Sequence, residues 1–202
     1  MPAAELKVLY ISERAGFVGG IERFIFHTAG LLRSAGIRVY GSFDRPDRDA
    51  ERFSENFDRM FPPDDLPETD LTVIHRIDDP EKLEQLIELR GDRLALYVHD
   101  HDYYCPRSYR YTPFGRHDCR RPYSLLRCGM CAMATSPRRW REGFCGELAA
   151  RTVRCRRKLE LLHRIPHVAV LSAFMRQKQL LEFDAQSQQE GTGHAALSAC
   201  RR

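Results

Sequence analysis

The segment LKVLYIS (residues 6–12), with the loop ERAGFVGG (13–20) and the segment IERFIFHTAGLLRSAG (21–36) after it, decides the fold class of this 202-residue chain. LKVLYIS is apolar and rich in β-branched and aromatic residues, which is typical of a buried strand. IRVYGSF (37–43) has the same character and predicts a second strand. A strand, a helix and a strand joined by short loops predict parallel pairing through a right-handed crossover.

The segment between these two strands has the pattern of an amphipathic helix. Gly36 follows it and predicts the end of the helix, because glycine readily adopts the left-handed conformation that closes helices. The residues that share helical spacing are Ile21, Phe24, Ile25, Thr28 and Leu32.

Strands and helices continue to alternate along the chain. The polar, proline-containing stretch 45–68 separates the first unit of this pattern from the next, with a short helix expected within 47–59. Further strands are predicted at 71–76, 93–100 and 167–172, and further helices at 79–91, 146–165 and 173–183. This order predicts an α/β fold with an open, mostly parallel Rossmann-like sheet and helices on both faces.

Two segments depart from the alternation. Residues 101–143 are rich in Arg, Cys, Pro and Tyr and exceed an ordinary connection, so we expect a Cys-rich basic insertion in a Rossmann-like domain at 1–183. Residues 184–202 hold one Leu and no aromatic residue, which predicts a disordered or aberrant tail.

Charge is distributed unevenly along the chain. Residues 1–104 carry 13 Lys/Arg against 21 Asp/Glu, whereas residues 105–164 carry 15 against 4. A basic block of this kind favours nucleic acid, anionic lipid headgroups or a phosphorylated substrate as partners. A solvated Arg-rich helix, balanced by the acidic half, explains the same pattern without a ligand.

Four of the seven cysteines lie close together in the sequence, at Cys105, Cys119, Cys128 and Cys131. Two cysteines in a CxxC arrangement can bind one tetrahedral ion, and two more complete a structural zinc site. His117 could replace one ligand, an iron–sulfur cluster fits less well, and four unligated cysteines are the alternative. The other cysteines, at 145, 155 and 200, have no such pattern.

Candidate binding residues lie where predicted strands and helices meet. Gly19 and Gly20 let the backbone approach a ligand at a helix N-terminus, although a tight turn would also explain them. Ligands of open α/β sheets bind beyond the carboxyl ends of the strands, where His99 and His101 are expected; the alternative is a histidine that bonds only to a neighbouring loop. Ser172 could contact a phosphate or sugar, and most simply caps a helix.

The sequence gives no indication of secretion or membrane insertion. Its first residues lack the basic start of a signal peptide, and no apolar run approaches the roughly 18 residues of a membrane span. We therefore expect a cytoplasmic protein.

These segments together resemble the N-terminal domain of the family 4 glycosyltransferases, which have the two-domain GT-B fold. The similarity covers residues 6 to about 183 in order: KVLYIS, GFVGGIERFIFHTAGLLRSAGIRVY, LYVHDHDYYCPR with the cysteines after it, and VAVLSAFMRQKQLLEF. One subgroup of the family is similar even in its His-Asp…Cys-Pro-Arg segment and its trailing cysteine cluster.

The resemblance implies a retaining glycosyltransferase that takes a sugar from a nucleotide-sugar donor. His99 would face the transferred sugar, with His101 as the rival for that role, and the Gly19–Gly20 loop would lie near the donor diphosphate and the acceptor. A phosphorylated or lipid-linked acceptor, with peripheral contact to the inner face of the membrane, would suit the basic segment. The implied substrate-binding residues are Gly19, Gly20, Glu22, Asp100, Arg107 and Ser172.

The resemblance ends where a second, donor-binding domain would begin. Because composition changes after Phe183, we expect a truncated or frame-shifted product, or half of a split enzyme, that is inactive alone. Donor binding would then require a second domain from elsewhere.

Two other hypotheses remain open. One is a zinc-stabilised nucleic-acid-binding protein, in which the aromatic residues of YYCPRSYRY (103–111) stack on bases between Arg contacts, although the Arg residues could equally serve phosphosugars and nucleic acid is the less favoured partner. The other is a non-catalytic α/β remnant with no ligand.

Overall fold

The computed structural model describes residues 6–112, 117–136 and 141–190. Within these residues the chain forms two compact units. The first unit comprises Met1–His99 with Ile165–Ala169, and the second comprises Asp100–Arg164 with Val170–Arg202. No helix among the described residues combines the length and apolar character needed to cross a membrane.

The first unit is built on an open six-stranded sheet in the order β3-β2-β1-β4-β5-β6. The pairings of β1 with β2 and β4, of β2 with β3, and of β4 with β5 are all parallel. This is the strand order of the Rossmann fold, so the predicted fold class is confirmed. The strands are β1 (Lys7–Ala15), β2 (Arg38–Pro46), β3 (Arg59–Phe61), β4 (Leu71–Ile74), β5 (Leu94–Val98) and β6 (His167–Val170).

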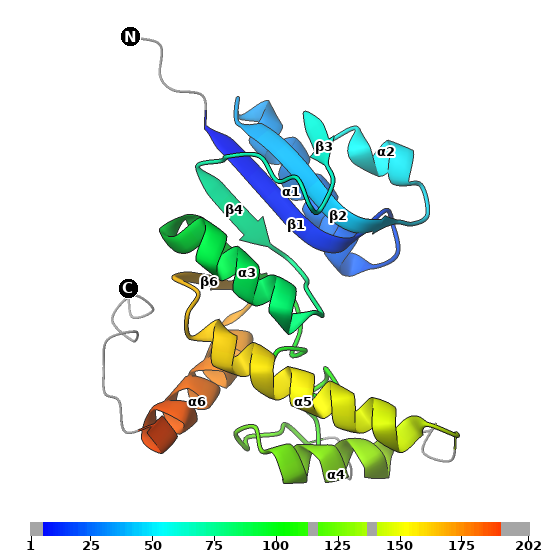
Figure 1. The fold of residues 1–202 in the computed structure, drawn as a ribbon, viewed down its shortest axis with the longest axis vertical. Helices are drawn as coiled ribbons and strands as arrows, with labels where there is room; N and C mark the ends of the chain where they lie inside the picture. Colours follow the sequence, from blue (N-terminus) through cyan, green and yellow to red (C-terminus); the bar gives the residue numbers. More distant parts are fainter. Residues whose placement is uncertain (1–5, 113–116, 137–140, 191–202) are drawn as a thin grey trace. The chain divides into compact units, whose positions relative to one another are not determined.

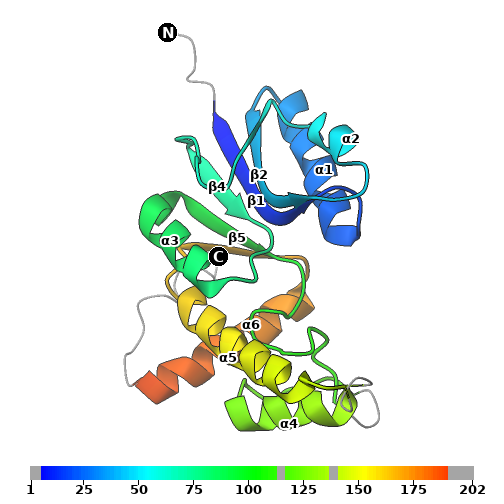
Figure 2. The same cartoon turned by 45° about the vertical axis from the view of Figure 1, so that its right-hand side comes forward.

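Strand β1 lies at the centre of the sheet and buries side chains on both faces. Val8 and Tyr10 point to one face, where they pack with Ile25 of α1 (Gly20–Ser34), while Leu9 and Ile11 alternate to the other face. Figures 1 and 2 show α1 on one face of the sheet and α3 (Pro80–Arg90) on the opposite face. A strand buried on both faces explains the continuous apolar run in the sequence.

The short elements of the first unit fall in the polar stretch after β2. They are helix α2 (Ala50–Ser54), which lies within the helix expected at 47–59, and strand β3, which was not predicted. Phe53 of α2 is fully buried and completes the core on the α1 face. A three-residue strand is too short to show an alternating pattern, which explains why β3 was missed.

The second unit is helical. It contains α4 (Leu125–Thr135), α5 (Phe144–Leu162) and α6 (Ala173–Glu190), and Asp100–Ser124 carries no helix or strand among its described residues. Helix α4 lies inside the segment expected to be irregular. Its exposed Leu126 and Met130 and its single buried residue, Ala132, give it no clear apolar face, so periodicity did not reveal it.

Helix α6 continues to Glu190, past Phe183, where the composition predicted that order would end. Ala, Gln and Glu follow Phe183, and these residues favour helix even without an apolar stripe. The remaining part of the predicted tail, residues 191–202, lies outside the described residues.

Gly36 ends helix α1 as predicted, through a Schellman motif. The amide of Ile37 donates to the carbonyl of Leu32, and the amide of Gly36 donates to the carbonyl of Arg33. Gly36 has φ +81°, in the left-handed region that disfavours residues with a Cβ.

We expect Gly36→Ala to lower the free energy of unfolding by roughly 1 kcal/mol, because alanine must adopt the left-handed conformation. The matched control is Gly20→Ala at the other end of α1, where no atom lies within 4 Å of an added Cβ. Denaturant titration of both variants checks this prediction. Equal losses of stability in the two variants would contradict it.

Candidate functional site

The candidate site of the first unit lies where the strand order reverses, between β1 and β4. The chain runs outward from β1 through β2 to β3, and outward in the other direction from β4 to β5. Ligands of open α/β sheets bind beyond the carboxyl ends of the strands at such a switch point. The backbone amide of His75, just after β4, donates to the carbonyl of Ile11 in β1, so β1 and the end of β4 are held side by side there.

His99 follows β5 and pairs with His75, which follows β4. His75 Nδ1 and His99 Nε2 share a hydrogen bond of 2.9 Å, so only one proton lies between the two rings. Phe24 of α1 lies edge-on to His99, with ring centroids 5.0 Å apart, and Tyr97 lies 4.9 Å from it. The predicted His99 is thus oriented by a histidine and two aromatic rings, and it keeps part of its surface exposed.

His75 itself is deeply buried, with 3% of its surface exposed. Burial, and then the neighbouring His99, lower the pKa of His75 well below its ordinary value, so the ring is neutral near pH 7. A neutral His75 can donate to or accept from His99 and thereby select the tautomer of His99.

The N-terminus of α1 lies at the same end of the sheet, because α1 directly follows β1. Gly19 is its N-cap residue, and Gly20 begins the helix. Neither glycine has a positive φ, and a Cβ on Gly20 would meet no atom within 4 Å. The fold therefore does not require glycine at position 20, and the open space beside it is available to a ligand.

Glu22 lies in the first turn of α1 and is buried, with 6% of its surface exposed. Its Oε2 lies close to Gly19: a Cβ built there would approach it to 3.2 Å. A carboxylate in the first turn already offsets the positive end of the helix dipole. This site therefore suits a ligand with neutral hydroxyl groups better than a second anion.

The other predicted site residues belong to the second unit, and each has a local structural partner. Asp100 accepts from the amide of Asp102 at 2.9 Å, and His101 Nδ1 shares a hydrogen bond of 2.8 Å with the Tyr104 hydroxyl. Ser172 Oγ accepts from the amide of Met175 at 3.2 Å, which confirms its prediction as a helix cap.

Arg107 and the four cysteines line one cavity in the second unit. Its volume is about 330 Å³, and its walls include Cys105, Cys119, Cys128 and Cys131. Arg107 Nη1 donates to the carbonyl of Tyr111 at 2.7 Å and approaches Cys131 Sγ at 3.5 Å. Across the described residues, no three His, Cys, Asp or Glu side chains are grouped closely enough to hold a metal ion as they stand. His117 is exposed and is not among the residues that line this cavity.

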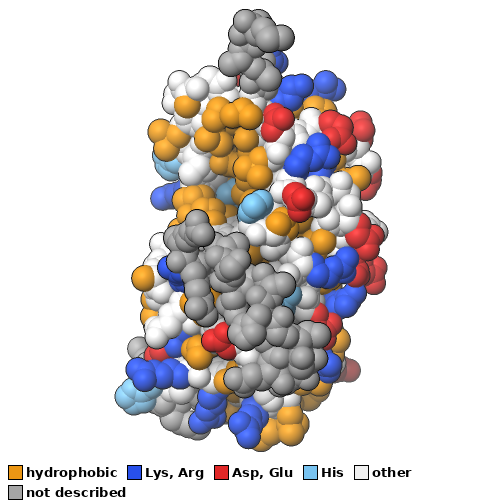
Figure 3. Space-filling model, turned by 90° about the vertical axis from the view of Figure 1, so that its left-hand side faces the viewer, with side chains coloured by type: hydrophobic (Ala, Val, Ile, Leu, Met, Phe, Trp, Pro, Cys, Tyr) orange, Lys and Arg blue, Asp and Glu red, His pale blue; other side chains and the backbone are white. Residues whose placement is uncertain are grey.

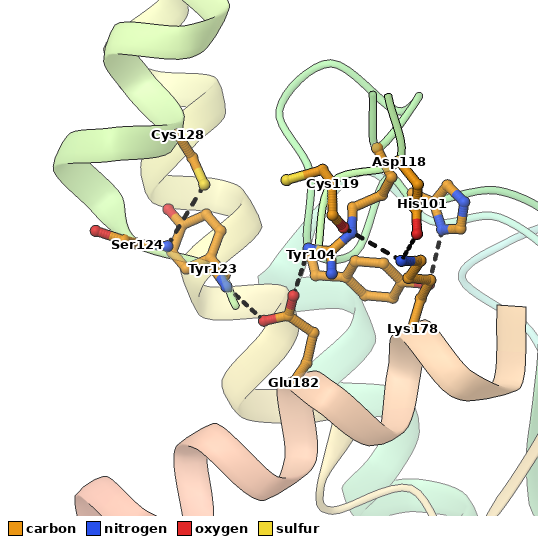
Figure 4. A network of polar contacts seen from close by, with 10 residues as sticks. His101, Tyr104, Asp118, Cys119, Tyr123, Ser124, Cys128, Lys178 and Glu182 are labelled. Atoms are coloured by element: carbon orange, nitrogen blue, oxygen red, sulfur yellow. Dashed lines mark hydrogen bonds and ion pairs between the residues drawn. The ribbon is translucent and has the colours of Figure 1, made fainter. Parts of the chain in front are cut away.

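The cysteine-bearing loop is anchored on α6 by two buried charged residues (Figure 4). Lys178 pairs with Asp118 and also donates to the carbonyl of Cys119 at 3.4 Å. Glu182 pairs with Arg110 and accepts from the amide of Tyr123 at 2.6 Å. Lys178 and Glu182 are 2% and 1% exposed, so both charges depend on these partners.

Sequence reasoning missed two groups at the switch point. One is His75, whose signal was a histidine directly after a predicted strand, in the same position as His99 after the next strand. The other is the ion pair between Glu13 and Arg76, 3.5 Å apart, which joins β1 to the end of β4. Both follow from strand order, which the sequence alone did not provide.

The fold and the switch-point residues define a Rossmann-type α/β protein with a candidate ligand site at the carboxyl edge of its sheet. Comparisons of this chain with protein-family models, curated proteins and solved structures found no match.

Burial of neutral His75 makes stability depend on pH. Since the folded-state pKa is lowered, the unfolded chain binds a proton below pH about 6.5 that the folded chain excludes. We expect the free energy of unfolding to fall as the pH decreases from 7 to 5, by at most about 1.4 kcal/mol per pH unit from this group.

Denaturant titrations across this pH range check the prediction. The variant His75→Phe should have a flatter dependence, while His27→Gln, at an exposed histidine on α1, should keep the wild-type dependence. An unchanged slope in His75→Phe would contradict the assignment.

Removing Arg110 should destabilise the second unit strongly, because Glu182 would remain buried without its cation. We expect Arg110→Met to cost about 3–5 kcal/mol. The control Arg156→Met, which breaks an exposed pair with Glu160, should cost at most about 0.5 kcal/mol. Amide hydrogen exchange along α6 measures both, and equal effects would contradict a buried ion pair.

Proposed function

We propose that this chain is the acceptor-side half of a retaining glycosyltransferase that transfers a sugar from a nucleotide-sugar donor. The observation that carries the proposal is the partly exposed His99, held by His75 beside the start of α1 at the switch point. This arrangement offers a hydrogen-bonding ring, and Gly20 leaves open space beside it. The sequence resemblance to the family 4 glycosyltransferases supplies the reaction class.

In this proposal His99 binds a hydroxyl group of the sugar, and His75 sets its tautomer. Gly20 lets the sugar approach the backbone of α1, and Glu22 favours hydroxyl groups over phosphate at that position. His101, bonded to Tyr104, is the weaker candidate for sugar contact because its ring nitrogen already has a partner. Burial, then the nearby Arg110, also lowers the pKa of His101.

A second α/β domain, supplied from elsewhere, would bind the donor. The acceptor would be phosphorylated or lipid-linked, because the second unit is rich in arginine, and the reaction would take place in the cytoplasm, at the inner face of the membrane for a lipid-linked acceptor. Figure 3 shows a face on which hydrophobic side chains (orange) reach the surface beside Lys and Arg (blue), as contact with an amphipathic acceptor would require.

Binding measurements on the purified chain test this proposal. We expect sugar phosphates or a short-chain lipid-linked sugar to bind, and nucleotide-sugars to bind only when the donor domain is added. His99→Ala should weaken acceptor binding roughly tenfold, the equivalent of about one hydrogen bond. His27→Ala is the matched control and should bind as the wild type does.

Two outcomes would contradict the proposal. One is an equal loss of affinity in His99→Ala and His27→Ala. The other is no binding of any sugar ligand, which would favour a non-catalytic α/β remnant.

Nucleic-acid binding by the second unit is a second candidate, favoured by the exposure of Tyr109 and Tyr111, which are 67% and 51% exposed. Aromatic rings flanked by arginines can stack on bases. RNA binding that weakens steeply with salt, and that Tyr109→Ala reduces, would support this candidate over the glycosyltransferase if sugar ligands do not bind.

A further inference from the structure

The four cysteines that line the cavity of the second unit come from separate parts of the chain. Cys105 follows the turn after His101, Cys119 lies in the loop anchored on α6, and Cys128 and Cys131 belong to α4. We propose that Cys105, Cys119, Cys128 and Cys131 bind one structural zinc ion as thiolates. This proposal is independent of the proposed glycosyltransferase function.

The backbone positions each cysteine separately. Cys128 and Cys131 are three residues apart on α4 and therefore share one face of the helix. The amide of Cys105 donates to the carbonyl of His101 at 2.8 Å, and the amide of Cys119 donates to the carbonyl of Arg110 at 2.7 Å. Figure 4 shows the sulfur atoms of Cys119 and Cys128 directed into the same gap.

Hydrogen-bond donors already lie at the sulfur atoms. The amide of Ser124 donates to Cys128 Sγ at 3.4 Å, and Arg107 Nη1 donates to Cys131 Sγ at 3.5 Å. Such donors stabilise thiolates and form the outer shell of many metal sites. They support ligation of a cation by these two cysteines in particular.

Positive charge around the cavity fits a tetrathiolate centre. Four thiolates on one Zn²⁺ carry a net charge of about −2. Arg107, Arg110, Arg121 and Arg127 line the cavity. Arg110 is 3% exposed, and its Nε and Nη2 have no hydrogen-bond partner in the described part of the chain. Those two N–H groups could donate to the thiolates and offset their charge.

The cysteine-bearing segment also lacks another source of stability. Among its described residues, 105–112 and 117–135, the buried side chains are Pro106, Arg110 and Ala132. A helix and loop with so small a core fold more readily when a metal joins them. On binding, each thiol gives its proton to solvent, and the side chains move from the cavity walls to Zn–S distances of about 2.3 Å.

Elemental analysis of the full chain, purified under reducing conditions, tests the proposal. We expect one zinc ion per chain, lost together with a decrease in melting temperature on chelation. Cobalt substitution should give the intense visible bands of a tetrahedral site with thiolate charge transfer. Cys128→Ser should lose the metal, while Cys145→Ser, at an exposed cysteine outside the cavity, should retain it.

A conservative variant covers the case in which Cys128→Ser fails to fold. Cys105→His should still bind one ion but should shift the cobalt spectrum, because one sulfur ligand becomes nitrogen. Full occupancy of Cys128→Ser, disulfides among the four cysteines in metal-free folded protein, or an iron–sulfur absorption spectrum would each overturn the proposal.

Discussion

The fold depends on the burial of β1 on both faces. Val8 and Tyr10 fill the layer between the sheet and α1, while Leu9 and Ile11 fill the layer on the opposite face. Each such side chain contributes on the order of 1.5–3 kcal/mol when fully buried. Because β1 pairs with both β2 and β4, these side chains also fix the point where the strand order reverses, and hence the place of the candidate site.

Two histidines at that point behave as one unit. His75 is excluded from water, and His99 is partly exposed and bonded to it. The buried ring cannot readily accept a second proton, so it constrains the proton position on the exposed ring. A histidine pair of this kind favours stable hydrogen bonding to a ligand over repeated exchange of protons with it.

The sequence predicted most of the first unit because its elements are long and bury regular apolar patterns. The helix end at Gly36 and the cap at Ser172 were also correct, since each depends on one local interaction. Strand β3 and helix α4 were missed because their order comes from neighbouring elements rather than from their own pattern. His75 was missed for a similar reason: a histidine after a strand gains significance only when the neighbouring strand is known.

Helix α6 imposes a strict register on the cysteine-bearing loop. Lys178 and Glu182 lie about one turn apart and hold the loop at Asp118 and at Arg110. A single residue inserted between them would rotate one anchor about 100° away from its partner. The spacing between these two positions is therefore much less free to change during evolution than the length of the helix beyond Glu182.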